Sequence, residues 1–369
     1  MTTTTKTTLW AMLMLLFAGS LLTSCNESED KEDDPNPPDT VLHNGLYVLC
    51  EGLYGRNNSS IDFYSIESRQ TTTDLFLQVN SAGLGETAND MIEAEGKLFI
   101  AVCGSNCVMV ADKATCRRLA LIPISQSDNP QPRCLAYSNG YVYLSCFDGN
   151  IHKINASTYK IEKTAKSFGR NPEAIAICQG KLFVANTGGL DYPNFDNSIS
   201  VLDPYDLSLI SKVEGFLNPG RIEVCGSSII FQKRGTYDYA TSSYKDSELI
   251  RLNAATLEVE QRANVIVNDF TLCGDKLIYT YTDNNLKPYI MYLPLDNLAD
   301  TPQQFISPES EDISGLMTPY HICSDGNHIY LTDAKDYTNN GECRVYDHSG
   351  KLQYKFSTWI NPTKVIAVQ

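Results

Sequence analysis

Polar and aromatic side chains gather in several long stretches between short apolar segments of this chain. Tyrosine, asparagine and aspartate in loops on a rigid scaffold are the usual composition of a ligand-recognising surface, since the rings stack and the amides form hydrogen bonds. Turns also favour Asn and Asp, but they do not require so many tyrosines. The pattern therefore predicts a ligand-binding face. Its candidate residues are Glu51, Tyr54, Asn57, Asn186, Asp191, Tyr192, Asn194, Phe195, Arg234, Tyr237, Tyr239, Tyr281, Asp283, Tyr320, Lys335, Asp336 and Tyr337.

Residues for catalysis are harder to find. The chain has no GxSxG, HExxH, P-loop or dinucleotide-binding motif. Only His321, at the start of a predicted strand, is placed near the centre of the predicted fold, and no residue that would orient it as an acid or base is visible. The segments 196–198 and 283–285 carry oxygen ligands of the kind that calcium binds, but polar loops are the favoured interpretation. We expect a binding protein rather than an enzyme, with no catalytic residue, no cofactor and no metal.

The elements that would position these loops are copies of one repeat. The stretch 171–203 predicts strands at 173–178, 181–185 and 198–202, with a tight turn between the first two. Leu182 and Val184 alternate with Phe183 and Ala185, so both faces of the second strand are apolar and both must be covered. Similar units recur at the glycines in positions 45, 96, 140, 180, 226, 274 and 326, which are 40 to 52 residues apart. This period is typical of β-propeller blades.

The two ends of the repeat array complement each other. The unit at Gly45 lacks the strand that precedes the glycine elsewhere, and residues 361–368 supply one. Pairing the tail with the first unit would remove an open sheet edge. We therefore predict an all-β domain at 41–369, a single seven-bladed β-propeller closed by its C-terminal strand. A solenoid, the alternative, would require capping repeats, and none is visible.

The N-terminal segment predicts export and anchoring. The apolar run Leu9–Leu22 is too short to span a bilayer comfortably and suits a signal peptide at 1–24. The sequence around Cys25 (LTSC) resembles the lipobox of bacterial lipoproteins, which implies lipidation of Cys25. Residues 25–40 are acidic and proline-rich and predict a disordered tether. A secreted protein cleaved nearby is the alternative.

Charge and cysteine usage narrow the function further. The net charge of −15 argues against nucleic acid and against an anionic membrane surface as partners. Of the twelve cysteines, eleven remain once Cys25 is lipidated, so at least one has no partner within the chain. Those at the ends of first strands are interpreted as small buried hydrophobes, while a Cys103–Cys107 disulfide stays open as an alternative. The strand-end cysteines are Cys178, Cys225, Cys273 and Cys323.

The repeats also carry a family resemblance. The segments GKLFVANTGG and ISVLD resemble the YVTN/YncE-like seven-bladed propellers. The segments GLYVLCEGLYGRNNSSIDFYS, PRCLAYSNGYVYLSC and NPEAIAICQGKLFVAN are similar to propeller lipoproteins of gut Bacteroidetes, among them the BtuG group. One departure is Cys50, where the group usually has Asn before the residue that corresponds to Glu51.

This resemblance implies a function. BtuG proteins capture vitamin B12 at the cell surface and hand it to the TonB-dependent transporter BtuB. We therefore expect a lipid-anchored outer-membrane protein that faces the cell exterior, with a corrinoid (cobalamin) as ligand and a BtuB-type transporter as partner. The alternatives are a binding lipoprotein for another nutrient, such as a glycan, and a propeller lyase or lactonase that depends on His321 or a metal.

Overall fold

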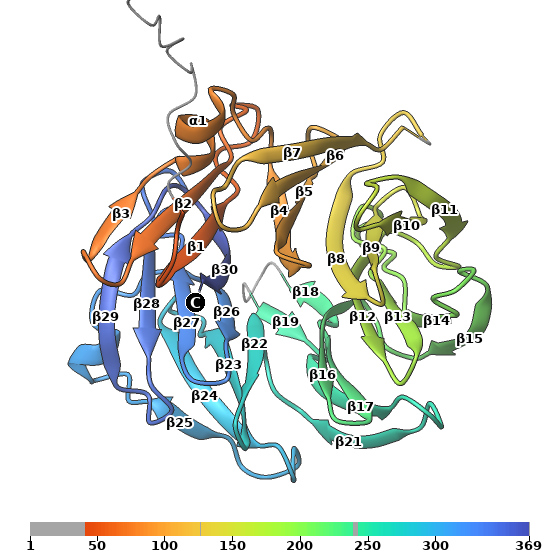
Figure 1. The fold of residues 1–369 in the computed structure, drawn as a ribbon. Coiled ribbons are helices and arrows are strands. Elements are labelled where there is room, and N and C mark those ends of the chain that lie inside the picture. Colours follow the sequence, from red (N-terminus) through yellow and green to blue (C-terminus); the bar gives the residue numbers. More distant parts are fainter. Residues whose placement is uncertain (1–40, 126, 239–242, 369) are drawn as a thin grey trace, which may run out of the picture. The chain divides into compact units, whose positions relative to one another are not determined.

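The predicted seven-bladed propeller is confirmed. The computed structural model describes residues 41–125, 127–238 and 243–368. Seven four-stranded antiparallel sheets form a ring, and one edge strand of each sheet, called the inner strand, lies nearest the axis (Figure 1). No helix in these described ranges is long and apolar enough to cross a membrane. The predicted signal peptide, Cys25 and the tether lie outside the described residues.

Each blade runs from an inner to an outer strand, and blade 1 takes its inner strand from the end of the chain. Blade 1 contains β30 (Pro362–Val368), β1 (Gly45–Cys50), β2 (Ser60–Ser65) and β3 (Gln70–Thr72), and blade 2 contains β4 (Ala88–Ala94), β5 (Lys97–Val102), β6 (Cys107–Asp112) and β7 (Arg118–Pro123). Blade 3 contains β8 (Pro132–Ser138), β9 (Tyr141–Cys146), β10 (Asn150–Asn155) and β11 (Ile161–Lys166). Blade 4 contains β12 (Pro172–Cys178), β13 (Lys181–Asn186), β14 (Ser198–Leu202) and β15 (Leu209–Glu214).

The remaining blades follow the same order, with three short additions. Blade 5 contains β16 (Pro219–Cys225), β17 (Ser228–Lys233), β20 (Glu248–Asn253) and β21 (Val259–Ala263). Blade 6 contains β22 (Asp269–Cys273), β23 (Lys276–Thr282), β24 (Pro288–Pro294) and β25 (Gln303–Ile306). Blade 7 contains β26 (Pro319–Ser324), β27 (Ile329–Asp333), β28 (Glu342–Tyr346) and β29 (Leu352–Ser357). The additions are helix α1 (Leu75–Asn80), the hairpin of β18 (Thr236–Asp238) and β19 (Ser243–Lys245), and the 3-10 helix η1 (Glu311–Ile313).

The strands of blade 4 follow the predicted pattern. Strand β12 begins at Pro172, where a missing amide hydrogen is tolerated because it is the first residue of the strand. Gln179 and Gly180 join β12 to β13 with φ of 47° and 69°, the positive values that a tight two-residue hairpin turn requires. Leu182 and Val184 pack toward blade 3, and the alternating Phe183 and Ala185 pack toward blade 5. The blade is therefore buried on both faces.

The same alternation fills every junction between blades and closes the ring. In the described ranges, each of the seven junctions holds its own cluster of buried apolar side chains. In β1, Tyr47 and Leu49 pack toward blade 2, whereas Leu46 and Val48 pack toward blade 7. Strand β30 pairs with β1 along its whole length, from Gly45 opposite Val368 to Cys50 opposite Pro362. The predicted closure by the C-terminal strand is confirmed.

The eleven cysteines in the described residues are all free thiols. No disulfide joins Cys103 and Cys107, although both are buried. Cys178 and Cys273 are buried at the ends of β12 and β22, in agreement with the prediction of small apolar side chains there. Cys225 and Cys323 are only half-buried.

Candidate ligand-binding site

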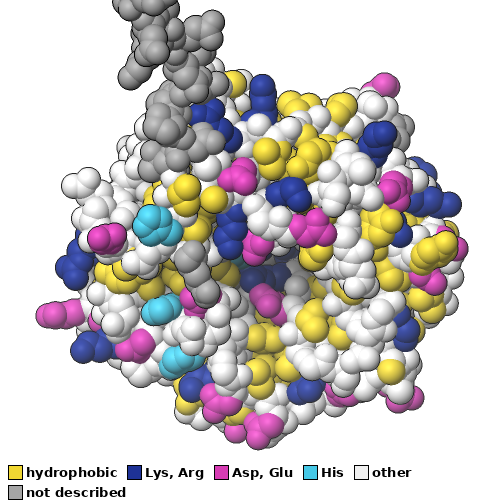
Figure 2. Space-filling model, in the orientation of Figure 1, with side chains coloured by type: hydrophobic (Ala, Val, Ile, Leu, Met, Phe, Trp, Pro, Cys, Tyr) yellow, Lys and Arg dark blue, Asp and Glu magenta, His cyan; other side chains and the backbone are white. Residues whose placement is uncertain are grey.

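One face of the ring carries the candidate loops, and a cavity on the axis opens among them. Inner strands begin on this face and second strands end on it, as the pairing of Pro172 with Asn186 shows for blade 4. We call it the loop face. The cavity has a volume of about 610 Å³, within the range of small-molecule sites, and residues from all seven blades line it. Figure 2 shows the ring hollowed at its centre, with basic and acidic side chains inside.

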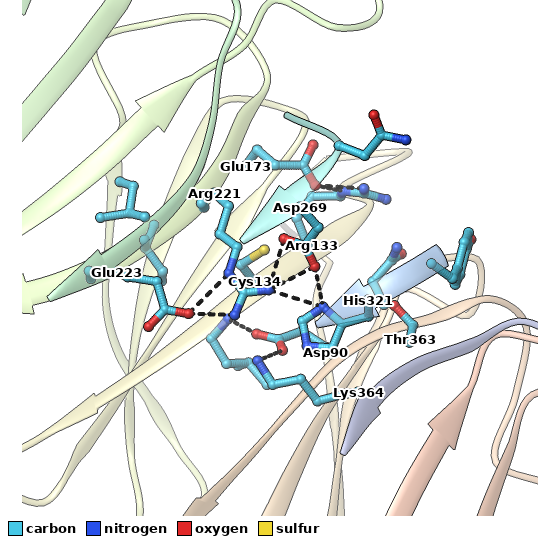
Figure 3. Close-up of a pocket in the computed structure, with 18 of the residues that line it drawn as sticks. Asp90, Arg133, Cys134, Glu173, Arg221, Glu223, Asp269, His321, Thr363 and Lys364 are labelled. Carbon is cyan, nitrogen blue, oxygen red and sulfur yellow. Dashed lines mark hydrogen bonds and ion pairs between the residues drawn. The ribbon is translucent and has the colours of Figure 1, made fainter. Parts of the chain in front are cut away.

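Charged side chains inside the cavity are paired across neighbouring blades (Figure 3). Arg133 on β8 donates to Glu173 on β12 from both Nη2 and Nε, at 2.7 and 3.1 Å. The Arg133 guanidinium also lies 4.3 Å from the centre of the Phe147 ring. Lys364 on β30 lies 3.2 Å from the Asp90 carboxylate on β4. These pairs connect blades 3 and 4, and blades 1 and 2.

The largest charged group in the cavity is centred on Arg221. This residue, on β16, donates from Nη1 to both Asp269 oxygens on β22 at 2.9 Å, and from Nε to Glu223 at 3.1 Å. Asp269 also accepts from the Ile322 amide at 3.0 Å. Burial alone would raise the pKa of Asp269, but the Arg221 guanidinium, together with His321, holds it well below its usual range.

His321 is oriented by the same carboxylate. Its Nδ1 lies 2.8 Å from Asp269 Oδ2, which can only accept, and 3.1 Å from Arg221 Nη1, which can only donate. The shorter contact with the carboxylate favours the tautomer that carries the proton on Nδ1. Burial lowers the pKa of His321 and favours the neutral imidazole. Its Nε2 then carries the lone pair, and this atom is buried without a hydrogen-bond partner among the described residues. Neutral imidazoles held in this way serve as proton acceptors or as ligands.

Two charged residues of the cavity differ from the others. Glu51, directly after β1, accepts a hydrogen bond from the Tyr320 hydroxyl at 2.6 Å and a weaker one from Asn89 at 3.4 Å. Burial raises the pKa of Glu51. Arg234, directly after β17, donates from Nε to Gln232 at 3.3 Å. Within the described ranges, neither Glu51 nor Arg234 has an oppositely charged side chain at ion-pair distance.

Sequence reasoning missed most of these cavity residues, although a signal for them exists. Each missed residue lies at or near the start of an inner strand. It follows the proline, glycine or asparagine at which the repeat begins by one to three positions. A charged side chain at this position points to the axis because the inner strand of each blade lines the cavity. The missed residues are Asp90, Arg133, Glu173, Arg221, Glu223, Asp269 and Lys364.

The predicted site residues fall into three groups on the loop face. The first group lines the cavity and consists of Glu51, Arg234 and Tyr320. The second lies on the loop face outside the cavity lining, with exposed or half-buried side chains. It consists of Tyr54, Asn57, Tyr192, Asn194, Phe195, Tyr237, Tyr281 and Tyr337. Tyr192 packs edge-on against Phe195 with ring centres 5.7 Å apart, and Tyr337 does so against Tyr320 at 6.0 Å.

The third group is engaged in holding the loops themselves. Asn186 is fully buried and donates to Ser198 and Ser200 inside blade 4, so it does not offer its amide to a ligand on the surface. Asp191 pairs with Arg170, and Lys335 lies 2.8 Å from Asp333. Asp283 and Asp336 accept backbone amides of their own turns. Tyr239 lies outside the described residues.

No cluster of three or more His, Cys, Asp or Glu side chains in the described ranges is placed to hold a metal ion. The site can instead bind through stacking, ion pairs and hydrogen bonds. Charged side chains line its cavity. The loop face also carries exposed aromatic side chains, Tyr54, Tyr192 and Tyr337, which we call the aromatic rim.

Comparisons with known proteins identify a family and a fold. A model of the family described as "Domain of unknown function (DUF5074)" matches residues 44–282. No curated protein matches the chain. Among solved structures, the chain is similar to a quinonprotein alcohol dehydrogenase-like protein from Bacteroides thetaiotaomicron, with 14% identity, coverage of 88% of this chain and 78% of that chain, and a TM-score of 0.62. It is also similar to the Pan2 WD40 domain of Neurospora crassa, with 11% identity, coverage of 75% and 80%, and a TM-score of 0.53. At these identities the likeness shows the fold alone.

Proposed function

This chain belongs to the DUF5074 family, and we propose that it is a binding protein, not an enzyme, that captures a corrinoid at the cell surface. In this proposal Cys25 carries a lipid anchor in the outer membrane, and residues 26–40 form the tether. The loop face receives cobalamin and passes it to a TonB-dependent transporter of the BtuB type. The corrinoid and the transporter come from the resemblance of the repeats to the BtuG group.

The observation that carries the proposal is the aromatic rim of the loop face. Tyr54 is 92% exposed, Tyr337 50% and Tyr192 49%, and they belong to blades 1, 7 and 4. Isolated exposed aromatics need no explanation, but these three lie on the one face of the ring where the polar cavity opens. A corrinoid is broad and flat, with amides around its edge. Such a ligand suits tyrosine rings that stack and polar groups that accept its amide hydrogens.

Calorimetric titration of cyanocobalamin into the wild-type protein tests the ligand. Binding energy concentrates in a few aromatic residues, so Tyr192→Ala and Tyr337→Ala should each cost about 1–3 kcal/mol, roughly 5- to 150-fold in Kd. Tyr205→Ala is the matched control. Tyr205 is 84% exposed, but it lies in the turn between β14 and β15, on the opposite face of the ring.

Three outcomes are informative. If the wild type gives no heat with cyanocobalamin, the corrinoid is wrong, and a panel of oligosaccharides then tests the alternative of a glycan-binding protein. If Tyr192→Ala and Tyr337→Ala both bind with wild-type affinity, the loop face is wrong. If Tyr205→Ala weakens binding as much as the other two, the effect is not specific to that face.

A second candidate function is favoured by one observation, the buried Asp269–His321 pair. Its unpartnered Nε2 is arranged as a general base would be, with a carboxylate holding the other nitrogen. This geometry suits a propeller lyase or lactonase acting at the axis. Turnover of an acidic sugar or a lactone that disappears in His321→Gln would support this candidate and count against a pure binding role.

A further inference from the structure

Most charged side chains of the axial cavity have an oppositely charged partner. Three groups of side chains form ion pairs at 2.7 to 3.2 Å between blades, so each charge in them has an oppositely charged partner. Burying such a charge alone would be costly, which explains why these residues occur together. The groups are Arg133 with Glu173, Arg221 with Glu223 and Asp269, and Lys364 with Asp90.

Glu51 and Arg234 are the exceptions in the described ranges, one negative and one positive. The side-chain hydrogen-bond partners of Glu51 are neutral, namely Tyr320, Asn89 and Thr363, and Arg133 acts on it without forming an ion pair. Arg234 has only the neutral Gln232. Both line the same cavity of about 610 Å³. A ligand that neutralises both must therefore carry one positive and one negative group.

The two residues lie on different sides of the cavity. Glu51 follows β1 in blade 1 and Arg234 follows β17 in blade 5. In a ring of seven blades, positions 1 and 5 are three steps apart in one direction and four in the other, which is as close to opposite as seven-fold geometry allows. The positive and negative groups of the ligand must therefore be separated rather than adjacent.

An unpartnered acceptor supports the placement of the positive group. The Nδ2 of Asn89 is directed to Glu51, while its Oδ1 is buried with no hydrogen-bond partner among the described residues. Buried acceptors are normally satisfied, so this atom indicates a missing donor beside Glu51. An ammonium group has three N–H donors and can serve the carboxylate and the amide oxygen at once. Burial raises the pKa of Glu51, and a cation bound beside the carboxylate would lower this pKa again.

We propose that the axial cavity binds a short peptide with free ends, its ammonium at Glu51 and Asn89 and its carboxylate at Arg234. Other ligand classes fit less well. A simple anion would leave Glu51 and the Asn89 oxygen unpaired, a simple cation would leave Arg234 unpaired, and a neutral sugar would pair neither charge. The proposal does not rest on corrinoid binding, because the cavity residues that it uses differ from the exposed tyrosines of the loop face.

Calorimetry with alanine peptides tests the proposal on the wild-type protein. Di-, tri- and tetra-alanine with free ends are titrated first, and the best of them is compared with its N-acetyl and C-amide forms. Hydrogen bonds to charged groups are strong when desolvated, so each cap should weaken binding about tenfold or more. If no free peptide binds, the proposal is wrong. If neither cap matters, or only one does, the ligand is not a zwitterion and the proposal is equally wrong.

Two variants assign the ends of the peptide to the two residues. In Glu51→Gln, the free peptide should bind about tenfold more weakly or worse, and N-acetylation should have no further effect. In Arg234→Gln, the same should hold for the C-amide. Additive effects of the mutation and the matching cap would contradict the assignment. The capped peptides on the wild type remain decisive even if a variant fails to fold.

Gly220→Ala offers a test that leaves every charge in place. A Cβ at Gly220 would lie 2.7 Å from Arg234 Nε and 2.8 Å from Gln232 Oε1, so the guanidinium must move. We expect this variant to resemble Arg234→Gln in peptide binding. Tyr205→Ala is the matched control, because it alters the opposite face of the ring and should leave peptide affinity unchanged. Wild-type peptide affinity in Gly220→Ala would contradict the role given to Arg234.

Discussion

Replacing Asp269 by asparagine tests the ion-pair group at the axis. The carboxylate accepts from Arg221, from His321 and from the Ile322 amide, and its side chain is only 14% exposed. An asparagine has nearly the same shape but carries no charge and has only one acceptor oxygen. The variant therefore leaves Arg221 with Glu223 as its only anionic partner.

The size of the effect follows from this geometry. Breaking a buried ion pair by removing one partner costs about 3–5 kcal/mol, because a charge is left without compensation. Arg221 keeps Glu223 and so stays compensated, and we therefore expect a smaller loss, about 1.5–3 kcal/mol at pH 7, from the hydrogen bonds that asparagine cannot accept. Urea unfolding followed by tryptophan fluorescence measures it. Asp275→Asn is the control, since Asp275 pairs with Lys276 at the surface and should leave the midpoint unchanged.

The pH dependence gives a sharper check. The pKa of Asp269 is lowered in the folded protein by Arg221 and His321, so its ionic contribution is present above the unfolded value of about 3.9 and is lost as the pH falls toward the folded value. The stability difference between wild type and Asp269→Asn should be constant from pH 7 to 5. Below about pH 4 it should shrink by at most about 1.4 kcal/mol per pH unit. A difference that stays constant down to pH 3, or grows, would refute the reasoning.

Three further predictions concern the anchor, the ring and the core. Cys25→Ala should release the protein from the membrane fraction, and a variant that still pellets with membranes and still takes up palmitate would exclude lipidation at Cys25. Removing residues 359–369 deletes β30 and with it the buried Val365 and Val368, so it should cost several kcal/mol at about 25 cal/mol per Å² of apolar surface; an unchanged melting temperature would contradict closure by this strand. Phe183→Ala should cost about 3–5 kcal/mol in urea unfolding, because Phe183 is fully buried between blades 4 and 5; a loss below 1 kcal/mol would mean that this junction repacks.

The fold could be derived from the sequence because its determinants are local. Leu182 and Val184 alternate with Phe183 and Ala185, and this alternation alone indicates a strand covered on both faces. The turn at Gln179 and Gly180 requires positive φ at both residues, a requirement that glycine meets at its own position without strain. Repetition of this unit then determines the number of blades. The missing strand before Gly45 and the extra strand at the C-terminus together indicate the closure.

The candidate site was recognised only in part for the same reason. Loop length and composition indicated which segments reach the loop face, but not which side chains remain free there. Asn186 resembles a ligand-binding amide in the sequence, yet the serines of β14 bind it inside the blade. This pairing depends on the register between β13 and β14, which a reading of loop composition does not include.

The pairing of charges in the axial cavity was decided by the tertiary structure. Arg221 meets Asp269 across 48 positions of sequence and His321 across 100, and Tyr320 meets Glu51 across 269. No local pattern encodes these distances, because the partners come together only when the ring closes and every inner strand faces one axis. The sequence by itself determines the blades, the turns and the closing strand. The ring geometry determines which charges are neutralised, which histidine nitrogen stays unpartnered, and why Glu51 and Arg234 remain available in the cavity.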